Sequence, residues 1–141
     1  MISVVVIGSG NVANHLILAF CENKSIDLVQ VYSRKSTFFP DCLSNSKITH
    51  DLSHLVEADV YIIAVSDNAI AEVSSKLPFE NKLVVHTSGS MPIETLKGKY
   101  RTKAMIPASV AITNVLLTHI TANITTCCNN TITIPANITK N

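Results

Sequence analysis

A glycine pattern near the N-terminus is the first feature whose spacing could do chemistry. Gly8, Gly10 and Ala13 form a G-x-G-x-x-A sequence directly after the apolar run from Ile2 to Ile7. The first glycine permits a sharp turn, the second lets backbone N–H groups approach a pyrophosphate, and the small third residue allows a helix to pack closely on a strand. The pattern therefore predicts a loop that cradles the phosphates of a dinucleotide. The alternative is a glycine turn that serves packing alone.

A basic turn follows the second apolar run, Leu28 to Tyr32. Sites for NAD usually carry an acidic residue at this point, about 20 residues after the glycines, which accepts hydrogen bonds from ribose hydroxyls. This sequence instead has Ser33, Arg34 and Lys35, whose hydroxyl, guanidinium and ammonium groups can bind a 2′-phosphate. We therefore expect NADP rather than NAD. The alternative is a solvated turn, which is common for adjacent basic residues.

The third strong apolar run, Val60 to Val65, leads into Ser66 and Asp67. Ligands of open α/β sheets lie beyond the carboxyl ends of the strands, so the backbone here should pass beside a cofactor, with Ser66 as a contact. For Asp67 we favour a helix N-cap, which is worth about 1 kcal/mol, over acid–base chemistry.

The fourth run, Leu83 to His86, ends in the hydroxyl-rich turn of Thr87 and Ser88. These hydroxyls could hydrogen-bond a carboxamide or a substrate carbonyl. His86 is a candidate acid or base because the ordinary pKa of histidine lies near neutrality. A structural role is the favoured interpretation, since a histidine at a strand end is more often a structural residue whose hydrogen bonds are satisfied.

The elements that would position these residues alternate along the chain. The run at residues 2–7 predicts a strand buried on both faces of a sheet, and β-like runs at 28–32, 60–65 and 83–86 predict three more strands. Helical spacing appears at residues 11–21 and 67–77, with shorter helical turns at 51–56 and 92–96 and a short strand at 48–49. This alternation predicts an α/β fold: a Rossmann-like, doubly wound, mainly parallel sheet with helices on both faces.

The composition changes after Lys99. Residues 102–141 contain nine Thr, seven Ile and six Asn, with no Gly and no acidic residue. Lys103 to Ile112 could add a last strand, and the rest is predicted to be irregular or β-rich. An edge hairpin or a departure of the reading frame from its ancestral course would each explain this tail. We expect a dinucleotide-binding domain over residues 1–100 and an atypical tail over 101–141.

The bulk properties exclude several classes of protein. A net charge of +1 over 141 residues leaves no electrostatic footprint for nucleic acid. No stretch approaches the roughly 18 apolar residues of a membrane span, and neither a signal peptide nor an anchor is recognised, so we expect a cytoplasmic location. The cysteines show no metal-ligand spacing, so we expect no metal site and four reduced thiols: Cys21, Cys42, Cys127 and Cys128.

Four segments of the chain together resemble a bacterial family of NADP oxidoreductases, in which a Rossmann-like domain precedes a helical domain of unknown function. They are VVVIGSGNVANHL, VYSRK, ADVYIIAVSDNAI and LVVHTSGSMPIETL, of which HTSGS is the most specific. That family is similar to pyrroline-5-carboxylate reductase, deazaflavin-dependent NADP reductase and the 6-phosphogluconate and 3-hydroxyisobutyrate dehydrogenases. The resemblance implies a pyrophosphate loop at Gly8, Ser9, Gly10, Asn11 and Val12, a ribose site at Ser33 and Arg34, and a nicotinamide end at Ala64, Val65, Ser66, Thr87 and Ser88.

The resemblance covers roughly residues 2–98. In the wider superfamily a helical domain completes the substrate pocket and often the dimer, and nothing after Tyr100 resembles it. Two hypotheses follow. The chain is either the NADP-binding domain of an oxidoreductase that acts on an unidentified small molecule, with a homodimer as its expected assembly, or a nucleotide-binding module, truncated or frame-shifted, that binds the cofactor without turnover.

Overall fold

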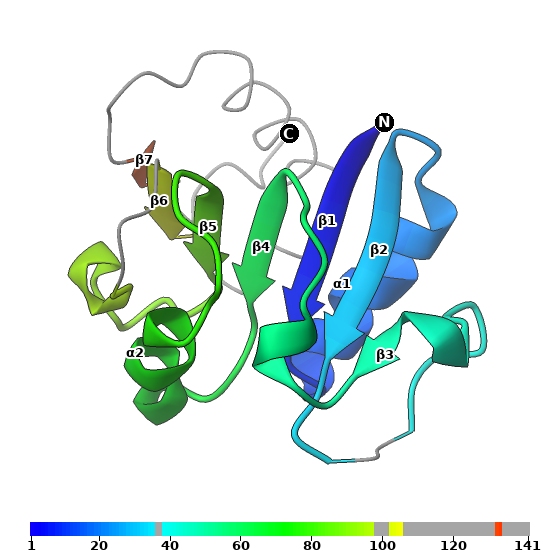
Figure 1. Ribbon diagram of the computed structural model, residues 1–141, viewed down its shortest axis with the longest axis horizontal. Coiled ribbons are helices and arrows are strands. Elements are labelled where there is room, and N and C mark those ends of the chain that lie inside the picture. Colours follow the sequence, from blue (N-terminus) through cyan, green and yellow to red (C-terminus); the bar gives the residue numbers. More distant parts are fainter. Residues whose placement is uncertain (36–37, 98–101, 106–131, 134–141) are drawn as a thin grey trace.

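Seven parallel strands form one sheet in the computed structural model, which describes residues 1–35, 38–97, 102–105 and 132–133 (Figure 1). The strand order is β3-β2-β1-β4-β5-β6-β7, and every described pairing is parallel. The strands are β1 (Ile2–Ile7), β2 (Ile26–Tyr32), β3 (Ile48–Thr49), β4 (Val60–Ile63), β5 (Leu83–His86), β6 (Thr102–Met105) and β7 (Ile132–Thr133). The order reverses direction at β1, which is the topological switch point of a doubly wound sheet.

Two α-helices cover opposite faces of this sheet (Figure 1). They are α1 (Asn11–Glu22) and α2 (Asp67–Ser75), and three short 3-10 turns accompany them: η1 (Asn45–Lys47), η2 (Leu52–His54) and η3 (Ile93–Thr95). The predicted Rossmann-like fold with helices on both faces is therefore confirmed. The short strand at 48–49 and the turns within 51–56 and 92–96 are also present.

The core consists of two layers, one on each face of the sheet. Val4 and Val6 pack with Leu16 of α1 on one face, whereas Val5 and Ile7 pack with Ile70 of α2 on the other. Successive side chains of a strand point to opposite faces, so a central strand covered on both sides must be apolar at every position. This is why the buried part of β1, from Val4 to Ile7, is an unbroken apolar run. The same packing places the turn after Ile7 between the two helical layers.

Most predicted bounds agree with the structure to within a few residues. β1 and β5 have the bounds that their apolar runs predicted, and α1 extends one residue further than expected. β4 ends at Ile63 rather than Val65, because the chain turns there toward α2, although the N–H of Ala64 still donates to the carbonyl of Ile7 at 2.8 Å. Of the expected last strand, 103–112, the described part lies in β6, and residues 106–112 lie outside the described residues.

One cysteine prediction is wrong. Cys21, near the end of α1, and Cys42, in the loop after β2, form a disulfide with their Cα atoms 6.3 Å apart. That separation falls within the range that a disulfide requires. The spacing of the two cysteines does not indicate the pairing, because the packing of α1 beside β2 brings these segments together. Cys127 and Cys128 lie outside the described residues.

Membrane-spanning helices and metal-binding clusters are both absent from the described ranges. No helix there is long and apolar enough to cross a membrane. Nor does any group of three or more His, Cys, Asp or Glu residues in the same ranges have an arrangement that could hold a metal ion.

Candidate functional site

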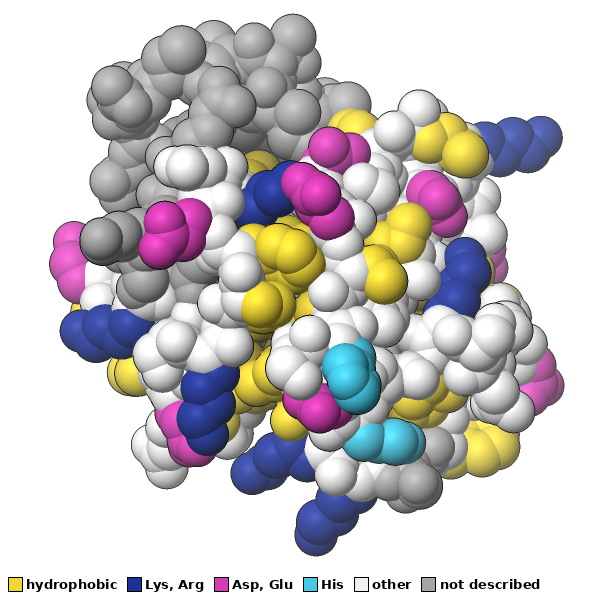
Figure 2. Space-filling view, in the orientation of Figure 1, with side chains coloured by type: hydrophobic (Ala, Val, Ile, Leu, Met, Phe, Trp, Pro, Cys, Tyr) yellow, Lys and Arg dark blue, Asp and Glu magenta, His cyan; other side chains and the backbone are white. Residues whose placement is uncertain are grey.

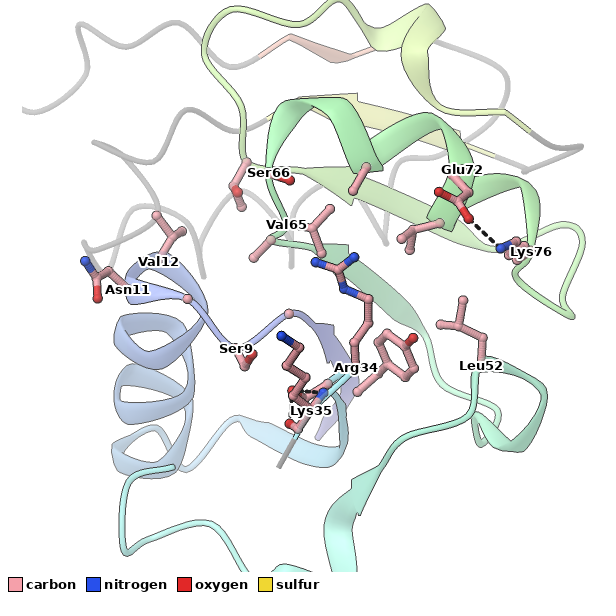
Figure 3. A pocket seen from close by; sticks show the side chains of 18 residues that line it. Ser9, Asn11, Val12, Arg34, Lys35, Leu52, Val65, Ser66, Glu72 and Lys76 are labelled. Carbon is pink, nitrogen blue, oxygen red and sulfur yellow. Dashed lines mark hydrogen bonds and ion pairs between the residues drawn. The ribbon is translucent and has the colours of Figure 1, made fainter. Parts of the chain in front are cut away.

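The carboxyl ends of four adjacent strands, β2, β1, β4 and β5, open onto one pocket of about 520 Å³. Several Lys and Arg side chains lie along this end of the molecule, at the lower edge of Figure 2. The structure brings together every predicted site residue except Ser88: Gly8, Ser9, Gly10, Asn11, Val12, Ser33, Arg34, Lys35, Ala64, Val65, Ser66 and Thr87 line the pocket (Figure 3). Six lining residues were not predicted: Tyr32, Leu52, Ala69, Glu72, Val73 and Lys76.

Gly8 joins the strands at the base of the pocket. Its N–H donates to the carbonyl of Tyr32 at 2.9 Å, and its φ of +137° is one that residues with a Cβ rarely adopt. A Cβ at this position would overlap the carbonyl group of Ala64. The first glycine is therefore required by the close approach of β1 and β4.

Gly10 has a different environment, at the start of α1. A Cβ built on Gly10 meets nothing within 4 Å, so the backbone here faces open space in the pocket. Gly10 is the N-cap of α1 without any side-chain cap, and the first turn of the helix contains no acidic residue. The first N–H groups of a helix have no acceptor within the helix, so this turn presents donors and the positive end of the helix dipole to the open space. The residues present thus fit a bound pyrophosphate.

In the turn after β2, the side chains of Arg34 and Lys35 line the pocket, whereas the hydroxyl of Ser33 is hydrogen-bonded within the turn. Ser33 is buried, and its Oγ donates to the carbonyl of Lys35 at 2.7 Å. Its backbone is held as well, since its N–H donates to Thr49 at 3.0 Å and its carbonyl lies 2.7 Å from the Nδ1 of His50. Ser33 therefore fixes the turn that carries Arg34, whose exposed side chain reaches into the pocket (Figure 3).

One face of α2 forms the opposite wall of the pocket. Ala69, Glu72, Val73 and Lys76 recur at the spacing of a helical face and all line the cavity. The Nζ of Lys76 donates to the Oε1 of Glu72 at 2.6 Å. That hydrogen bond, the charge of Lys76 and the charge of Arg34 lower the pKa of Glu72. Helical spacing counted from Ser66 could have predicted this wall, because it places residues 69, 73 and 76 on the same side of the helix as Ser66.

Asp67 is not the helix N-cap that its sequence position predicted. The N-cap is Ser66, and Asp67 is the first residue of α2. The carboxylate of Asp67 instead accepts a hydrogen bond from the Oγ of Ser90 at 2.8 Å. Hydrogen bonds from Ser88 and Ser90 lower its pKa. The helix therefore begins one residue earlier than its predicted N-cap implied. The side chain of Asp67 links α2 to the turn after β5.

The polar side-chain atoms of His86 and Ser88 form hydrogen bonds within the turn after β5. The Nδ1 of buried His86 accepts from the N–H of Ser88 at 3.2 Å, so Nε2 carries the proton and donates to the carbonyl of Pro92, also at 3.2 Å. Burial lowers the pKa of His86. The Oγ of Ser88 accepts from the N–H groups of Ser90 and Met91, which explains why Ser88 does not line the pocket while Thr87 does.

Comparison with known structures finds this fold in longer proteins. A candidate NADP oxidoreductase from Bacteroides fragilis is 30% identical, with a TM-score of 0.54, over 70% of this chain and 41% of its own. A DAP dehydrogenase variant from Clostridium tetani, bound to DAP, is 17% identical with a TM-score of 0.51, over 77% of this chain and 36% of that one. The chain thus spans less than half of each, and the second likeness concerns the fold alone.

Comparison at the level of sequence gives the family. No curated protein matches the chain. The family described as "NADP oxidoreductase coenzyme F420-dependent" matches residues 3–89, a range that contains the whole of the pocket lining. The chain therefore belongs to this family of NADP oxidoreductases.

Proposed function

We propose that the domain binds NADP(H) in the pocket and holds it for hydride transfer to or from a small molecule. The main observation in support is that the start of α1 and the basic turn after β2 line the same cavity. The open backbone at Gly10 begins α1, and Arg34 and Lys35 follow β2 on the neighbouring side. A pyrophosphate and a 2′-phosphate are the two anionic groups of NADP, and each would have a matching set of donors here.

The extent of the pocket supports a dinucleotide rather than a mononucleotide. Its lining residues follow four strands in the order β2, β1, β4, β5, so the pocket crosses three strand spacings. At about 4.8 Å for each spacing, the distance is roughly 14 Å. Two nucleosides joined by a pyrophosphate can span such a groove, with the adenosine at the end of β2 and the nicotinamide at the ends of β4 and β5.

The residues at the two ends have different tasks in this proposal. Arg34 and Lys35 would hold the 2′-phosphate, and the N–H groups at the start of α1 would hold the pyrophosphate. At the other end Ala64, Val65, Ser66 and Thr87 would flank the nicotinamide riboside, whose ring supplies the hydride chemistry when it is bound. His86 would take no part in proton transfer, because its two ring nitrogens are engaged by Ser88 and Pro92.

The preference for NADP over NAD rests on the charges after β2. A carboxylate at this point would accept hydrogen bonds from the ribose hydroxyls and repel a 2′-phosphate. The sequence places Ser33, Arg34 and Lys35 there instead, and the hydroxyl of Ser33 is turned into the loop. The description of the family and that of the Bacteroides fragilis relative, which both name NADP, also support this preference.

A fluorescence titration of the full chain with NADPH tests the binding site. The variant Gly10→Asp places a carboxylate in the space proposed for the pyrophosphate, and we expect it to weaken NADPH binding at least 100-fold, because like charges repel at close range. Asn45→Asp adds the same charge at an exposed position of η1 outside the pocket and should bind as wild type does. NADPH binding by Gly10→Asp that equals wild type would overturn the assignment.

Turnover is a separate measurement. The description of the family names coenzyme F420, so F420 is the first acceptor to supply with NADPH. Loss of the NADPH absorbance in the presence of F420, and none with Gly10→Asp, is the expected result. Binding of NADPH without oxidation by F420 would support either a different acceptor or the nucleotide-binding module that binds the cofactor without turnover.

A further inference from the structure

The pocket contains one acidic side chain among its described lining residues, that of Glu72. It lies on α2, on the wall that Arg34 approaches from the end of β2 (Figure 3). Both residues line the same pocket, and the charge of Arg34 is the smallest of the causes that lower the pKa of Glu72, after the hydrogen bond and charge of Lys76. Glu72 is thus a carboxylate close to the place where the proposed function puts a 2′-phosphate.

Such a carboxylate opposes the binding of NADP in two ways. It repels the phosphate directly, and it attracts the guanidinium of Arg34 away from the phosphate. Because its pKa is lowered by the hydrogen bond and charge of Lys76 and by Arg34, Glu72 is ionised throughout the neutral range. Two unit charges about 4 Å apart in water interact strongly enough to change a dissociation constant about fivefold.

Lys76 neutralises this carboxylate. Its Nζ lies 2.6 Å from the Oε1 of Glu72, one helical turn away, and both side chains line the pocket. Both side chains of the pair are exposed, so the pair contributes little to helix stability. Unlike an ordinary surface pair, the Glu72–Lys76 pair lines the pocket. It therefore determines the charge that a bound ligand meets on the α2 wall.

We propose that Lys76 is a specificity-determining residue for the 2′-phosphate, acting by masking the carboxylate of Glu72 and leaving Arg34 free to bind the ligand. This inference rests on the proposed NADP site. With Lys76 in place, three cations face one carboxylate in the pocket: Arg34, Lys35 and Lys76 against Glu72. Without it, the α2 wall carries an unmasked negative charge that NADPH meets and NADH, which lacks the 2′-phosphate, meets far more weakly.

The test measures dissociation constants for NADPH and NADH at low ionic strength, where charge effects are least screened. We expect Lys76→Met to weaken NADPH binding about five- to tenfold and NADH binding less than twofold. The double variant Glu72→Gln/Lys76→Met should restore the NADPH to NADH ratio to within twofold of wild type, because the carboxylate that Lys76 masks is gone.

A matched control is available in a second ion pair. The Nζ of Lys82 lies 2.6 Å from the Oε1 of Glu57, and neither residue lines the pocket. Lys82→Met and Glu57→Gln/Lys82→Met remove the same groups elsewhere and should leave the ratio of the two dissociation constants unchanged.

Three outcomes would count against these ideas, and they are distinguishable. Equal weakening of NADPH and NADH by Lys76→Met would make the pair structural and overturn the inference. A loss of NADPH affinity that Glu72→Gln does not rescue would mean direct contact between Lys76 and the phosphate, which overturns the masking role. Wild type that binds neither nucleotide would overturn the proposed function itself.

Discussion

The main chain of Gly8 lies so close to the carbonyl group of Ala64 that a Cβ at position 8 would overlap it. Gly8 also has a φ of +137°. We therefore expect Gly8→Ala to lower the free energy of unfolding by about 3 kcal/mol, or to prevent folding, because it adds both backbone strain and a steric overlap. Guanidinium denaturation of wild type and variant measures the difference.

Gly10→Ala is the companion variant, since it makes the same substitution two residues away. Nothing lies within 4 Å of the added Cβ, and Gly10 is an N-cap without a side-chain bond. The free energy of unfolding should fall by less than about 1 kcal/mol. If both alanine variants lose the same stability, the distinction between a glycine needed for strand packing and one needed for ligand access is wrong.

His86 predicts how stability depends on pH. Burial lowers its pKa in the folded chain from an ordinary value of 6.5, so the unfolded chain takes up the proton first as the pH falls. The contribution of His86 to stability is complete above pH 6.5 and is lost as the pH falls from there toward the lowered pKa of the folded state. The loss has a slope of up to about 1.4 kcal/mol for each pH unit.

Denaturation curves at several pH values between 7 and 5 would reveal that slope. His86→Gln should have a shallower dependence than wild type over this range, whereas His15→Gln, at an exposed position of α1, should follow wild type. An NMR titration gives the same answer without a variant: an imidazole of His86 that titrates at or above 6.5 would contradict the buried, neutral state.

Tyr61 of β4 packs on the face of the sheet that α2 covers. Its hydroxyl donates to the carbonyl of Val56 and accepts from the N–H of Ala58, both at 2.9 Å, and its ring stacks on that of Phe79. Burial raises the pKa of Tyr61 to about 12. Tyr61→Phe keeps the ring but leaves both backbone partners without the hydroxyl.

We expect Tyr61→Phe to cost about 1–2 kcal/mol of stability, since the buried N–H of Ala58 and the part-buried carbonyl of Val56 would lose their hydrogen bonds. NADPH binding should not change, because Tyr61 does not line the pocket. Thermal unfolding and the NADPH titration, performed on the same preparation, check both statements. Unchanged stability would mean that water or a neighbour replaces the hydroxyl.

The disulfide between Cys21 and Cys42 should be visible in stability. The two residues are 21 positions apart, and closing a loop of that length is expected to contribute about 3 kcal/mol. Dithiothreitol should therefore lower the denaturation midpoint of wild type and have no effect on Cys21→Ser/Cys42→Ser. The same midpoint with and without reductant would mean that the two thiols are not linked.

The sequence predicted those parts of the molecule that depend on local pattern. The bounds of β1 and β5 were predicted to the residue because strands buried on both faces are mainly apolar; Ser3 of β1 and buried His86 of β5 are the exceptions. The loop at Gly8 and the cations at Arg34 and Lys35 were placed at one sheet edge because the strands of a doubly wound sheet all end there.

The sequence failed where tertiary proximity decides the outcome. Glu72 and Lys76 have the spacing of an ordinary exposed helix pair, and only the packing of α2 against β4 makes their face a pocket wall. The same holds for Cys21 and Cys42, which meet through the arrangement of α1 and the loop after β2. Asp67 was misjudged for a local reason: a helix start is uncertain by a residue or two when Ser and Asp are adjacent.

The central claim is that the basic turn after β2 binds the 2′-phosphate of NADP. Side-by-side calorimetric titrations of wild type and Arg34→Glu with NADPH and NADH test it most directly. Charge-assisted hydrogen bonds predict that wild type binds NADPH about 10- to 100-fold more tightly than NADH and that Arg34→Glu abolishes or reverses this preference. Equal affinity of wild type for the two nucleotides, or the same fold-change for both in Arg34→Glu, would contradict the account.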